Sequence, residues 1–494
     1  MIPSIAGLIV SACLALLGYL LGAPLIIGLF ASMPFGSTAF ATLTALGGSS
    51  PLSYTLFALG IIAAVALRRN VLRDVGIVFT RFPATWIVLF LTIYTIVSAM
   101  IFPRLFEGQT TAFIPIDGEP TELPLSPTSG NITQTAYFTL GALTFLAFSI
   151  ILLREENLKL VRNGFFTFVT VNAALGILDL GAKLAGAGDI LLPIRTASYS
   201  LLVEVEHAGF WRIAGGFAEA SAFGGTSLMC LAFTYVYWRM GKSRIAFLLT
   251  ILLLLLLLLS TSSTAYAGLA ILSIAPLISL TRSALQNRFT FDDLLLLGLG
   301  FCALVISVTV FLYNERLFDP IVNLVETTIL DKPLSESGIE RAYWNERSLQ
   351  AFLDTNAVGI GMGSSRSSSW IVSVLSQLGL IGALAMLSLV FVILRGMGRQ
   401  KPTAETAEIF VFAAAVRAAI AAQLLAGSMA GSGADPGMLF FITLSVILAC
   451  RRFGAGRRAG FANSEDYSRS RSDVVGSQGR AAPVRPLPLH PHRP

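Results

Sequence analysis

The sequence of 494 residues is 55% hydrophobic and only 13% charged, and its mean hydropathy is +0.76. About a quarter of the residues in an ordinary soluble domain are charged, so this composition excludes a soluble globular protein and indicates a polytopic membrane protein. The net charge of +6 comes mostly from short loops and the C-terminal tail, and it does not indicate nucleic-acid binding.

Apolar stretches of the length that crosses a bilayer, about 20 residues, recur along the chain and predict an all-α protein with about twelve transmembrane helices. Gly18, Gly22 and Pro24 interrupt the first stretch, which is therefore either one span or a broken, re-entrant pair. The predicted spans are 5–30, 52–67, 84–103, 135–153, 163–186, 221–238, 244–260, 264–281, 292–313, 369–394, 408–427 and 436–450. The N-terminus lacks the basic region of a cleaved signal peptide.

Lys and Arg gather in alternate loops, as they do in the cytoplasmic loops of membrane proteins. This alternation places both termini in the cytoplasm and three extended loops, 104–134, 187–220 and 314–368, on the outer face. We assign residues 1–458 to the transmembrane domain and the Ser-, Gly- and Pro-rich residues 459–494 to a disordered cytoplasmic tail. The basic residues that set this orientation include Arg68, Arg69, Arg73, Arg81, Arg154, Lys159, Arg162, Arg239, Lys242, Arg244, Arg282, Arg288, Arg395, Arg399, Lys401, Arg451 and Arg452.

The first outer loop, 104–134, contains Pro115, Pro120, Pro124 and Pro127 and is expected to have little regular structure. Its Asn131-Ile132-Thr133 sequence matches a glycosylation acceptor, which we interpret as a chance match because the pattern is common.

The outer loop 314–368, between the ninth and tenth predicted spans, is far longer than most connections, and loops of this length are usually functional or disordered. Ser337 and Glu340 have the spacing of a capping box, which predicts the start of a helix. An apolar stripe follows, formed by Ile339, Tyr343, Leu349 and Phe352. Such a helix would lie on the membrane surface and carry Arg341 and Arg347 over the bilayer boundary.

Cys13, Cys230, Cys302 and Cys450 all lie in or beside apolar stretches. They are interpreted as small buried hydrophobic residues and not as a disulfide framework or a metal site. His490 and His492 lie in the predicted tail and are expected to be solvent-exposed. The sequence therefore predicts neither a metal ion nor another cofactor.

Three segments carry recognisable motifs: RIAGGFAEASAFGGTSLMCLAF begins at Arg212, ERAYWNERSLQAFLDTNAVGIGMGSS runs from Glu340 to Ser365, and SQLGLIGALAML follows. Taken together, they resemble the O-antigen polymerase and ligase family of bacterial inner membranes. The first is similar to that family's Arg-Gly-Phe segment before a helix of small residues, the second to its Arg-aromatic segment that ends in Gly-x-Gly-x-Gly, and the third to the helix that follows. The resemblance covers about 200 residues, from about 190 to 395.

The resemblance implies a GT-C-like fold and a glycosyltransferase that uses undecaprenyl-diphosphate-linked glycans at the outer face of the bacterial inner membrane. It implies no nucleotide sugar and no obligatory metal, and a chain-length regulator and a flippase are further expected partners besides the lipid bilayer. Ser263 and Thr264 stand where the family often has an Arg, and the loop 314–368 lacks the His that is usual in the ligase branch. These departures favour a polymerase of the exopolysaccharide type over a ligase.

The chemistry of this transfer needs fixed cations, because negative charge grows on the diphosphate as its bond to the anomeric carbon breaks. Arginine is always protonated and binds phosphate with two hydrogen bonds, so Arg212, Arg341 and Arg347 are the candidate diphosphate ligands. The acceptor hydroxyl needs a general base. Glu219, at the start of a predicted helix, is the first candidate, although a helix cap or an Arg partner would explain it equally well. His207 is the alternative.

Charged residues inside predicted spans are costly unless they face protein or water. Arg417 is therefore expected either to hold the diphosphate or to lock two helices together. Asp179 and Lys183 are four residues apart, so they could pair on one helix face. Asp435 lies in an Asp-Pro-Gly sequence and is interpreted as a turn residue.

Three functions remain open at this point. A polymerase joins lipid-linked repeats, and a ligase moves the finished polymer from the same donor to another acceptor. A transporter of lipid-linked sugars or polysaccharide is the alternative from another class, because about twelve spans is a common count for transporters and the intramembrane charges could line a path. No clear internal repeat supports a transporter.

Overall fold

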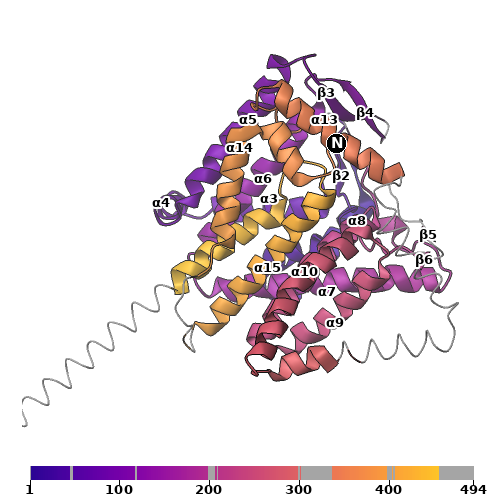
Figure 1. Ribbon diagram of the computed structural model, residues 1–494. Helices are drawn as coiled ribbons and strands as arrows, with labels where there is room; N and C mark the ends of the chain where they lie inside the picture. The colour runs from indigo at the N-terminus through magenta and orange to yellow at the C-terminus, as the bar shows by residue number, and fades with distance from the viewer. Residues whose placement is uncertain are drawn as a thin grey trace, which may run out of the picture.

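The computed structural model describes residues 2–44, 48–116, 119–198, 206–207, 210–298, 301, 336–397, 403 and 406–454. These residues form a bundle of α-helices with three two-stranded antiparallel sheets (Figure 1). Several sequence predictions lie outside the described residues: Cys302, most of the ninth predicted span, the first part of the loop 314–368, and the tail 459–494.

The helices occupy most of the predicted spans. In chain order they are α1 (Ile5–Leu20), α2 (Pro24–Ser32), α3 (Ser53–Ala66), α4 (Val71–Arg81), α5 (Ala84–Leu105), α6 (Ser129–Ile151), α7 (Asn157–Leu184), α8 (Ala220–Gly241), α9 (Arg244–Leu259), α10 (Ser263–Leu285), α13 (Glu336–Asp354), α14 (Trp370–Leu394) and α15 (Ala407–Ala430). Two further helices cover residues 291–298 and 438–454.

Six of these helices, α5, α6, α7, α10, α14 and α15, are long and apolar enough to cross a membrane. A seventh span results if α3 and α4, which meet at a bend of 105°, are counted as one. The chain is therefore an α-helical multi-pass membrane protein, as its composition predicts. The larger number of about twelve spans and the GT-C-like arrangement stay predictions.

The first predicted span is broken, as its Gly and Pro residues suggested. Gly22 has φ +81, and Pro24 begins α2. A Cβ on Gly18 would lie 2.6 Å from the carbonyl oxygen of Pro24, so only glycine lets the two helices approach this closely. The short pair α1–α2 thus folds back on itself.

Two predictions about connecting segments are wrong. The basic segment after residue 67 was expected to be a loop, yet it forms α4, whose Val78 is buried in the core. The loop 104–134 was expected to be irregular, yet it forms a hairpin of β3 (Thr111–Ile116) and β4 (Glu119–Pro124). Prolines fit there because a two-stranded ribbon consists only of edge strands, where a missing N–H is tolerated.

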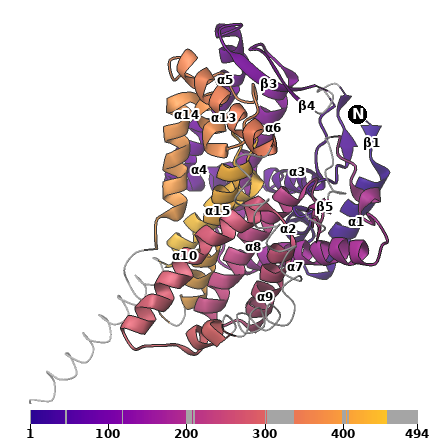
Figure 2. The ribbon, with the colours of Figure 1, turned by 45° about the vertical axis from the view of Figure 1, so that its right-hand side comes forward.

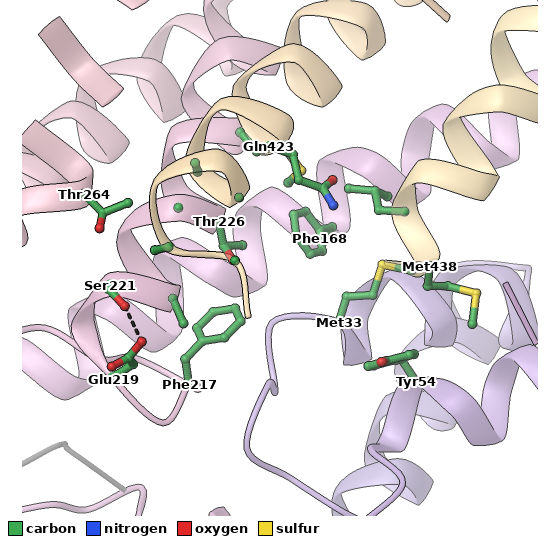
Figure 3. A pocket seen from close by; sticks show the side chains of 18 residues that line it. Met33, Tyr54, Phe168, Phe217, Glu219, Ser221, Thr226, Thr264, Gln423 and Met438 are labelled. Atoms are coloured by element: carbon green, nitrogen blue, oxygen red, sulfur yellow. Dashed lines mark hydrogen bonds between the residues drawn. The ribbon is translucent and has the colours of Figure 1, made fainter. Parts of the chain in front are cut away.

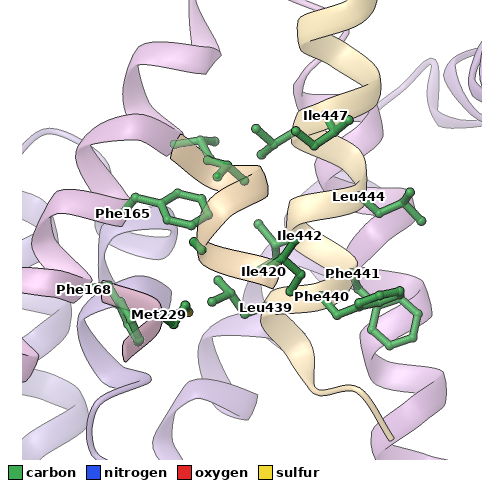
Figure 4. Packing of buried hydrophobic residues seen from close by; sticks show 14 of the residues in the cluster. Phe165, Phe168, Met229, Ile420, Leu439, Phe440, Phe441, Ile442, Leu444 and Ile447 are labelled. Atoms are coloured by element: carbon green, nitrogen blue, oxygen red, sulfur yellow. The ribbon is translucent and has the colours of Figure 1, made fainter. Parts of the chain in front are cut away.

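The core of the bundle is built from aromatic and branched side chains of α6, α7, α8, α15 and residues 438–454 (Figure 4). Phe165 of α7 stacks on Phe233 of α8 with ring centroids 5.3 Å apart, and Phe138 of α6 meets the edge of Phe441 at 5.2 Å. Among the described cysteines, Cys230 and Cys450 are buried as predicted, whereas Cys13 is exposed.

The two ends of the bundle differ. The β3–β4 hairpin and α13 lie together at one end, and α14 runs from there to the opposite end (Figures 1 and 2). The poly-leucine helix α9 lies at the side of the bundle. It buries Leu253 and Leu257 and leaves Leu255 and Leu258 about half exposed.

Candidate functional site

The segment 212–219, which leads into α8, is held by a buried group of charges. The carboxylate of Asp179 accepts hydrogen bonds from the backbone N–H groups of Ala214, at 2.7 Å, and Gly215, at 3.0 Å. Lys183 pairs with Asp179 at 3.0 Å, as the spacing predicted, and also donates to the carbonyl oxygen of Arg212 at 2.7 Å. Asp179 and Lys183 therefore fix the backbone beside Arg212.

Arg195 completes this group, which we call the α7 charge network (Asp179, Lys183, Asp189 and Arg195). Its guanidinium pairs with Asp189 and donates to the carbonyl oxygen of Gly215. The four charges balance, and the side chains of all four are at most 3% exposed. Asp179 and Lys183, two charged residues of a predicted span, thus hold the backbone of the segment 212–215 in place.

The side chain of Arg212 is half-buried and within electrostatic reach of two other charged groups. Burial and the nearby Arg341 guanidinium lower the pKa of Arg212, and the Glu219 carboxylate raises it. The Nε of Arg212 is buried without a hydrogen-bond partner. Within the described part of the chain, no carboxylate forms an ion pair with Arg212 or Arg341. The structure therefore brings together three residues that the sequence singled out: Arg212, Glu219 and Arg341.

Glu219 is the N-cap residue of α8, but its carboxylate makes no capping hydrogen bond to the backbone. It accepts a hydrogen bond from the hydroxyl of Ser221 (Figure 3). The partial positive charge at a helix N-terminus favours a carboxylate at this position. Glu219 therefore lies at the start of α8, and its carboxylate is not engaged in a capping hydrogen bond to the helix backbone.

Glu219 and Ser221 line a cavity with a volume of about 360 Å³ (Figure 3). Most of its wall is apolar and comes from Met33, Phe168, Phe217, Met229, Met438 and Leu439. Glu219 lies beside Ser221 and Phe217, whereas Met33, Tyr54 and Met438 lie across the cavity from them. The cavity is amphipathic, which suits a ligand with a polar head and a hydrocarbon part.

The Gly-x-Gly-x-Gly segment is structural. Gly359, Gly361 and Gly363 have φ values of +93, +94 and +77. The N–H of Gly361 donates to the carbonyl oxygen of Gln377 at 2.9 Å, and that of Gly363 donates to the Gln377 side chain at 2.8 Å. These N–H groups are therefore occupied by protein acceptors and do not form a phosphate-binding loop.

The acceptors for this segment arise from a kink in α14. Gly379 has φ +63, which interrupts the helix and frees the carbonyl groups of the preceding turn. The N–H of Ile360 donates to Ser376, and the N–H of Leu380 donates to Ala357, both at 2.9 Å. The two segments of the family resemblance, 340–365 and the start of α14, thus fold as one unit.

Arg347 is engaged elsewhere. It lies 3.4 Å from the carboxylate of Glu122 on the β3–β4 hairpin, and its Nε donates to the hydroxyl of Tyr343 at 3.2 Å. Tyr343 and Thr111 also donate to Glu122, and these bonds lower the pKa of its carboxyl group. Arg347 therefore holds α13 on the hairpin, and its role as a diphosphate ligand stays a prediction.

The remaining candidates lie apart from Arg212. Arg417 donates to the carbonyl oxygen of Arg395, past the C-terminal end of α14, at 3.3 Å, and its role as a diphosphate ligand stays a prediction. Asp435 accepts from the N–H of Gly437 at 2.9 Å and is a turn residue as predicted, with its pKa raised to about 6 by burial. His207 lies in β5 (Glu206–His207), which pairs with β6 (Phe210–Trp211). The side chain of His207 lies outside the described part of the structure, so its role as the general base stays a prediction.

Asn131 lies in α6 and is buried, unlike a residue of a surface loop. Its amide nitrogen donates to the carbonyl oxygen of Met362 at 2.8 Å, and its side-chain oxygen accepts from the N–H of Thr128. Asn131 is 4% exposed, so this position in α6 is closed to glycosylation in the folded protein. The interpretation of the sequence match as a chance one agrees with this burial.

These observations define the class of protein: a multi-pass α-helical membrane protein with an amphipathic cavity that a carboxylate lines, and with two arginines within electrostatic reach of each other near that carboxylate. Comparison of the chain with known protein families, with curated proteins and with solved structures finds no match.

Proposed function

We propose that this protein is a membrane glycosyltransferase that polymerises undecaprenyl-diphosphate-linked oligosaccharide repeats at the outer face of the bacterial inner membrane, with both termini in the cytoplasm. The observation that carries the proposal is the position of Arg212, a half-buried guanidinium without an ion-pair partner among the described residues, close to Glu219 at the amphipathic cavity. A cation held in this way suits a diphosphate, and the apolar wall suits its lipid.

In the proposed reaction, a hydroxyl group of one repeat attacks the anomeric carbon of the other. The bond from that carbon to the diphosphate oxygen breaks, and a new glycosidic bond forms. Glu219 accepts the proton of the attacking hydroxyl. Arg212 and Arg341 stabilise the charge that develops on the departing lipid diphosphate, and groups held in place in this way cost little reorganisation.

The proposal is tested by mass spectrometry of the lipid-linked glycans from cells that lack the protein. A polymerase leaves single repeats on the carrier when it is deleted. Full-length polymer stranded on the carrier would instead identify a ligase, and unchanged glycans would contradict both enzymes and favour a transporter. The deletion strain is then complemented with the natural chain and with variants.

Arg212→Ala and Arg341→Ala should each abolish long polymer while the protein stays in the membrane. The matched control is Arg366→Ala, because Arg366 is an exposed arginine beyond the same Gly-x-Gly-x-Gly segment and forms no ion pair within the described residues. Normal chain lengths in both Arg212→Ala and Arg341→Ala cells would overturn the assignment of these two residues.

A further inference from the structure

The end of the bundle opposite the hairpin carries a second group of arginines. The carbonyl oxygen of Arg395 accepts from Nη1 of Arg417 and from Nη2 of Arg451. Two guanidinium groups, from α15 and from the helix 438–454, therefore converge on one oxygen atom, and the exposed Arg395 guanidinium is within electrostatic reach of Arg451. We call Arg395, Arg417 and Arg451 the arginine cluster.

No acidic side chain within the described ranges forms an ion pair with the cluster. Two other groups of charges inside the bundle are paired: the α7 charge network is neutral, and Arg239 pairs with Asp293. By contrast, none of the three guanidiniums of the cluster forms an ion pair with a described carboxylate. The Nε of Arg451 is also buried without a hydrogen-bond partner.

The carbonyl groups at the end of α14 account for only part of this arrangement. Arg451 donates to the carbonyl of Val392 as well as to that of Arg395, and cations favour the C-terminal end of a helix. That end carries only about half a negative charge, whereas two guanidiniums donate to it. Like charges this close repel each other unless an anion lies between them.

We infer that the arginine cluster binds the phosphate headgroup of an anionic phospholipid in the leaflet at this end of the bundle. Arg417 and Arg451 are half-buried on neighbouring helices, and both keep donors beyond the carbonyl bonds described. Basic pockets between transmembrane helices bind anionic headgroups in this way. The lipid would complete the charge balance and tie α14, α15 and the last helix together. The site is separate from Arg212 and does not depend on the proposed activity.

The test uses the purified full-length chain in detergent and native mass spectrometry with two lipids of the same acyl chains, dioleoyl phosphatidylglycerol and dioleoyl phosphatidylcholine. We expect retention of the phosphatidylglycerol and little of the phosphatidylcholine. Each guanidinium near a headgroup contributes about 1 kcal/mol, so Arg417→Gln should weaken phosphatidylglycerol binding about fivefold, and Arg417→Gln with Arg451→Gln about 25-fold.

Two controls separate this site from a generally basic surface. Arg417→Lys keeps the charge and should retain most of the binding. Arg282→Gln removes an exposed basic residue from the last turn of α10 and should leave binding unchanged. Equal binding of the two lipids would overturn the inference, and so would an equal loss in Arg282→Gln and Arg417→Gln.

Inorganic phosphate distinguishes a lipid headgroup from a soluble anion. Millimolar phosphate should not displace bound phosphatidylglycerol or raise the unfolding temperature as the lipid does. If phosphate alone reproduces the stabilisation, the site binds a soluble anion and the lipid assignment is wrong. The unfolding temperature of each variant without lipid shows whether it is folded, and the comparison of the two lipids on the natural chain tests the inference without any variant.

Discussion

The carboxylate of Asp179 holds the backbone of Ala214, whose N–H donates to it at 2.7 Å. The two residues lie on α7 and on the segment that enters α8, and Arg212 is only two positions before Ala214. Because the neighbouring amide of Gly215 binds the same oxygen, the segment has little freedom to turn. The direction in which Arg212 points is thus set by a carboxylate in another helix.

Replacing Asp179 by Asn should therefore affect both stability and the site. The change leaves Lys183 without its buried anion while Arg195 keeps Asp189, and breaking a buried pair in this way costs about 3–5 kcal/mol. The unfolding temperature in detergent should fall, and amide exchange of Ala214 and Gly215 should rise. Unchanged exchange at these two amides would show that Asp179 does not hold the segment.

A positioning role for Asp179 also predicts non-additivity with Arg212. If Asp179 acts through Arg212, adding Asp179→Asn to Arg212→Ala should reduce polymer formation no further than Arg212→Ala alone. Asp179→Asn with Lys183→Met removes both charges and should restore part of the lost stability. Additive losses of activity, measured at equal amounts of folded protein, would contradict this role.

Glu219→Gln tests the proposed general base. Glutamine keeps the size of the side chain and an acceptor for Ser221, but it cannot take up a proton at neutral pH. The rate of polymerisation should fall about 100-fold or more, within the range of general base catalysis, while binding of the lipid-linked substrate is retained. Ser221→Ala is the structural comparison and should cost less. A Glu219→Gln protein with an unchanged rate would move the role of base to another group.

Gly361→Ala should destabilise the fold by about 2 kcal/mol or more, because its φ is +94 and a Cβ would lie 2.6 Å from the carbonyl oxygen of Ser98. Gly181→Ala provides the control. It lies within α7 with nothing within 4 Å of a new Cβ, so alanine should stabilise the helix there by about 0.5–1 kcal/mol. Thermal unfolding of the two variants in the same detergent measures the difference.

The contact between α13 and the hairpin should depend on pH. The pKa of Glu122 is lowered from its ordinary value of 4.5 by bonds from Thr111 and Tyr343, so the contact favours the ionised carboxylate. Its stabilising effect is complete above about pH 4.5 and is lost as the pH falls through the lower value of the folded state. Fluorescence of Trp344, with the other tryptophans replaced by Phe, should report this change.

Glu122→Gln is the matched variant for the pH measurement. It keeps an acceptor for Tyr343 but has no carboxyl group to titrate, so the acid-dependent part of the fluorescence change should disappear. Arg347→Met removes the cation instead and should shift the transition towards higher pH. An identical transition in the natural chain and in Glu122→Gln would exclude this carboxyl group as its origin.

Patterns within one stretch of chain predicted much of the fold. Hydrophobic length located the helices from α5 to α10 as well as α14 and α15, the spacing of Ser337 and Glu340 predicted a helix where α13 lies, and the spacing of Asp179 and Lys183 predicted their pairing. The sequence did not predict features that depend on contacts between residues far apart in the chain. Nothing local shows that Arg195 pairs with Asp189 and binds Gly215, or that the glycines at 359–363 bind a kinked helix. In α4, interspersed charges hid a buried apolar face.

For the candidate site too, the sequence predicted individual residues but not the contacts that they make with distant parts of the chain. The identity of Arg212, Glu219 and Arg341 came from residue chemistry and from the family resemblance, and the structure places them within electrostatic reach. The sequence could not show that Arg347 is held by Glu122, because that contact joins residues on two segments far apart in the chain. Nor could it separate the roles of Arg212 and Arg417, which depend on the end of the bundle to which each side chain points.

The Gly-x-Gly-x-Gly segment lies against α5 and α6, and this position has a consequence for the order in which the protein assembles during synthesis. Gly361 packs against the backbone of α5, and Asn131 of α6 binds the carbonyl group of Met362, 231 positions later in the chain. Both helices are translated and inserted long before this partner exists. The surfaces of α5 and α6 that contact this segment therefore stay uncovered in the bilayer until the segment has been synthesised. A nascent chain that stops before Gly379 cannot cover them.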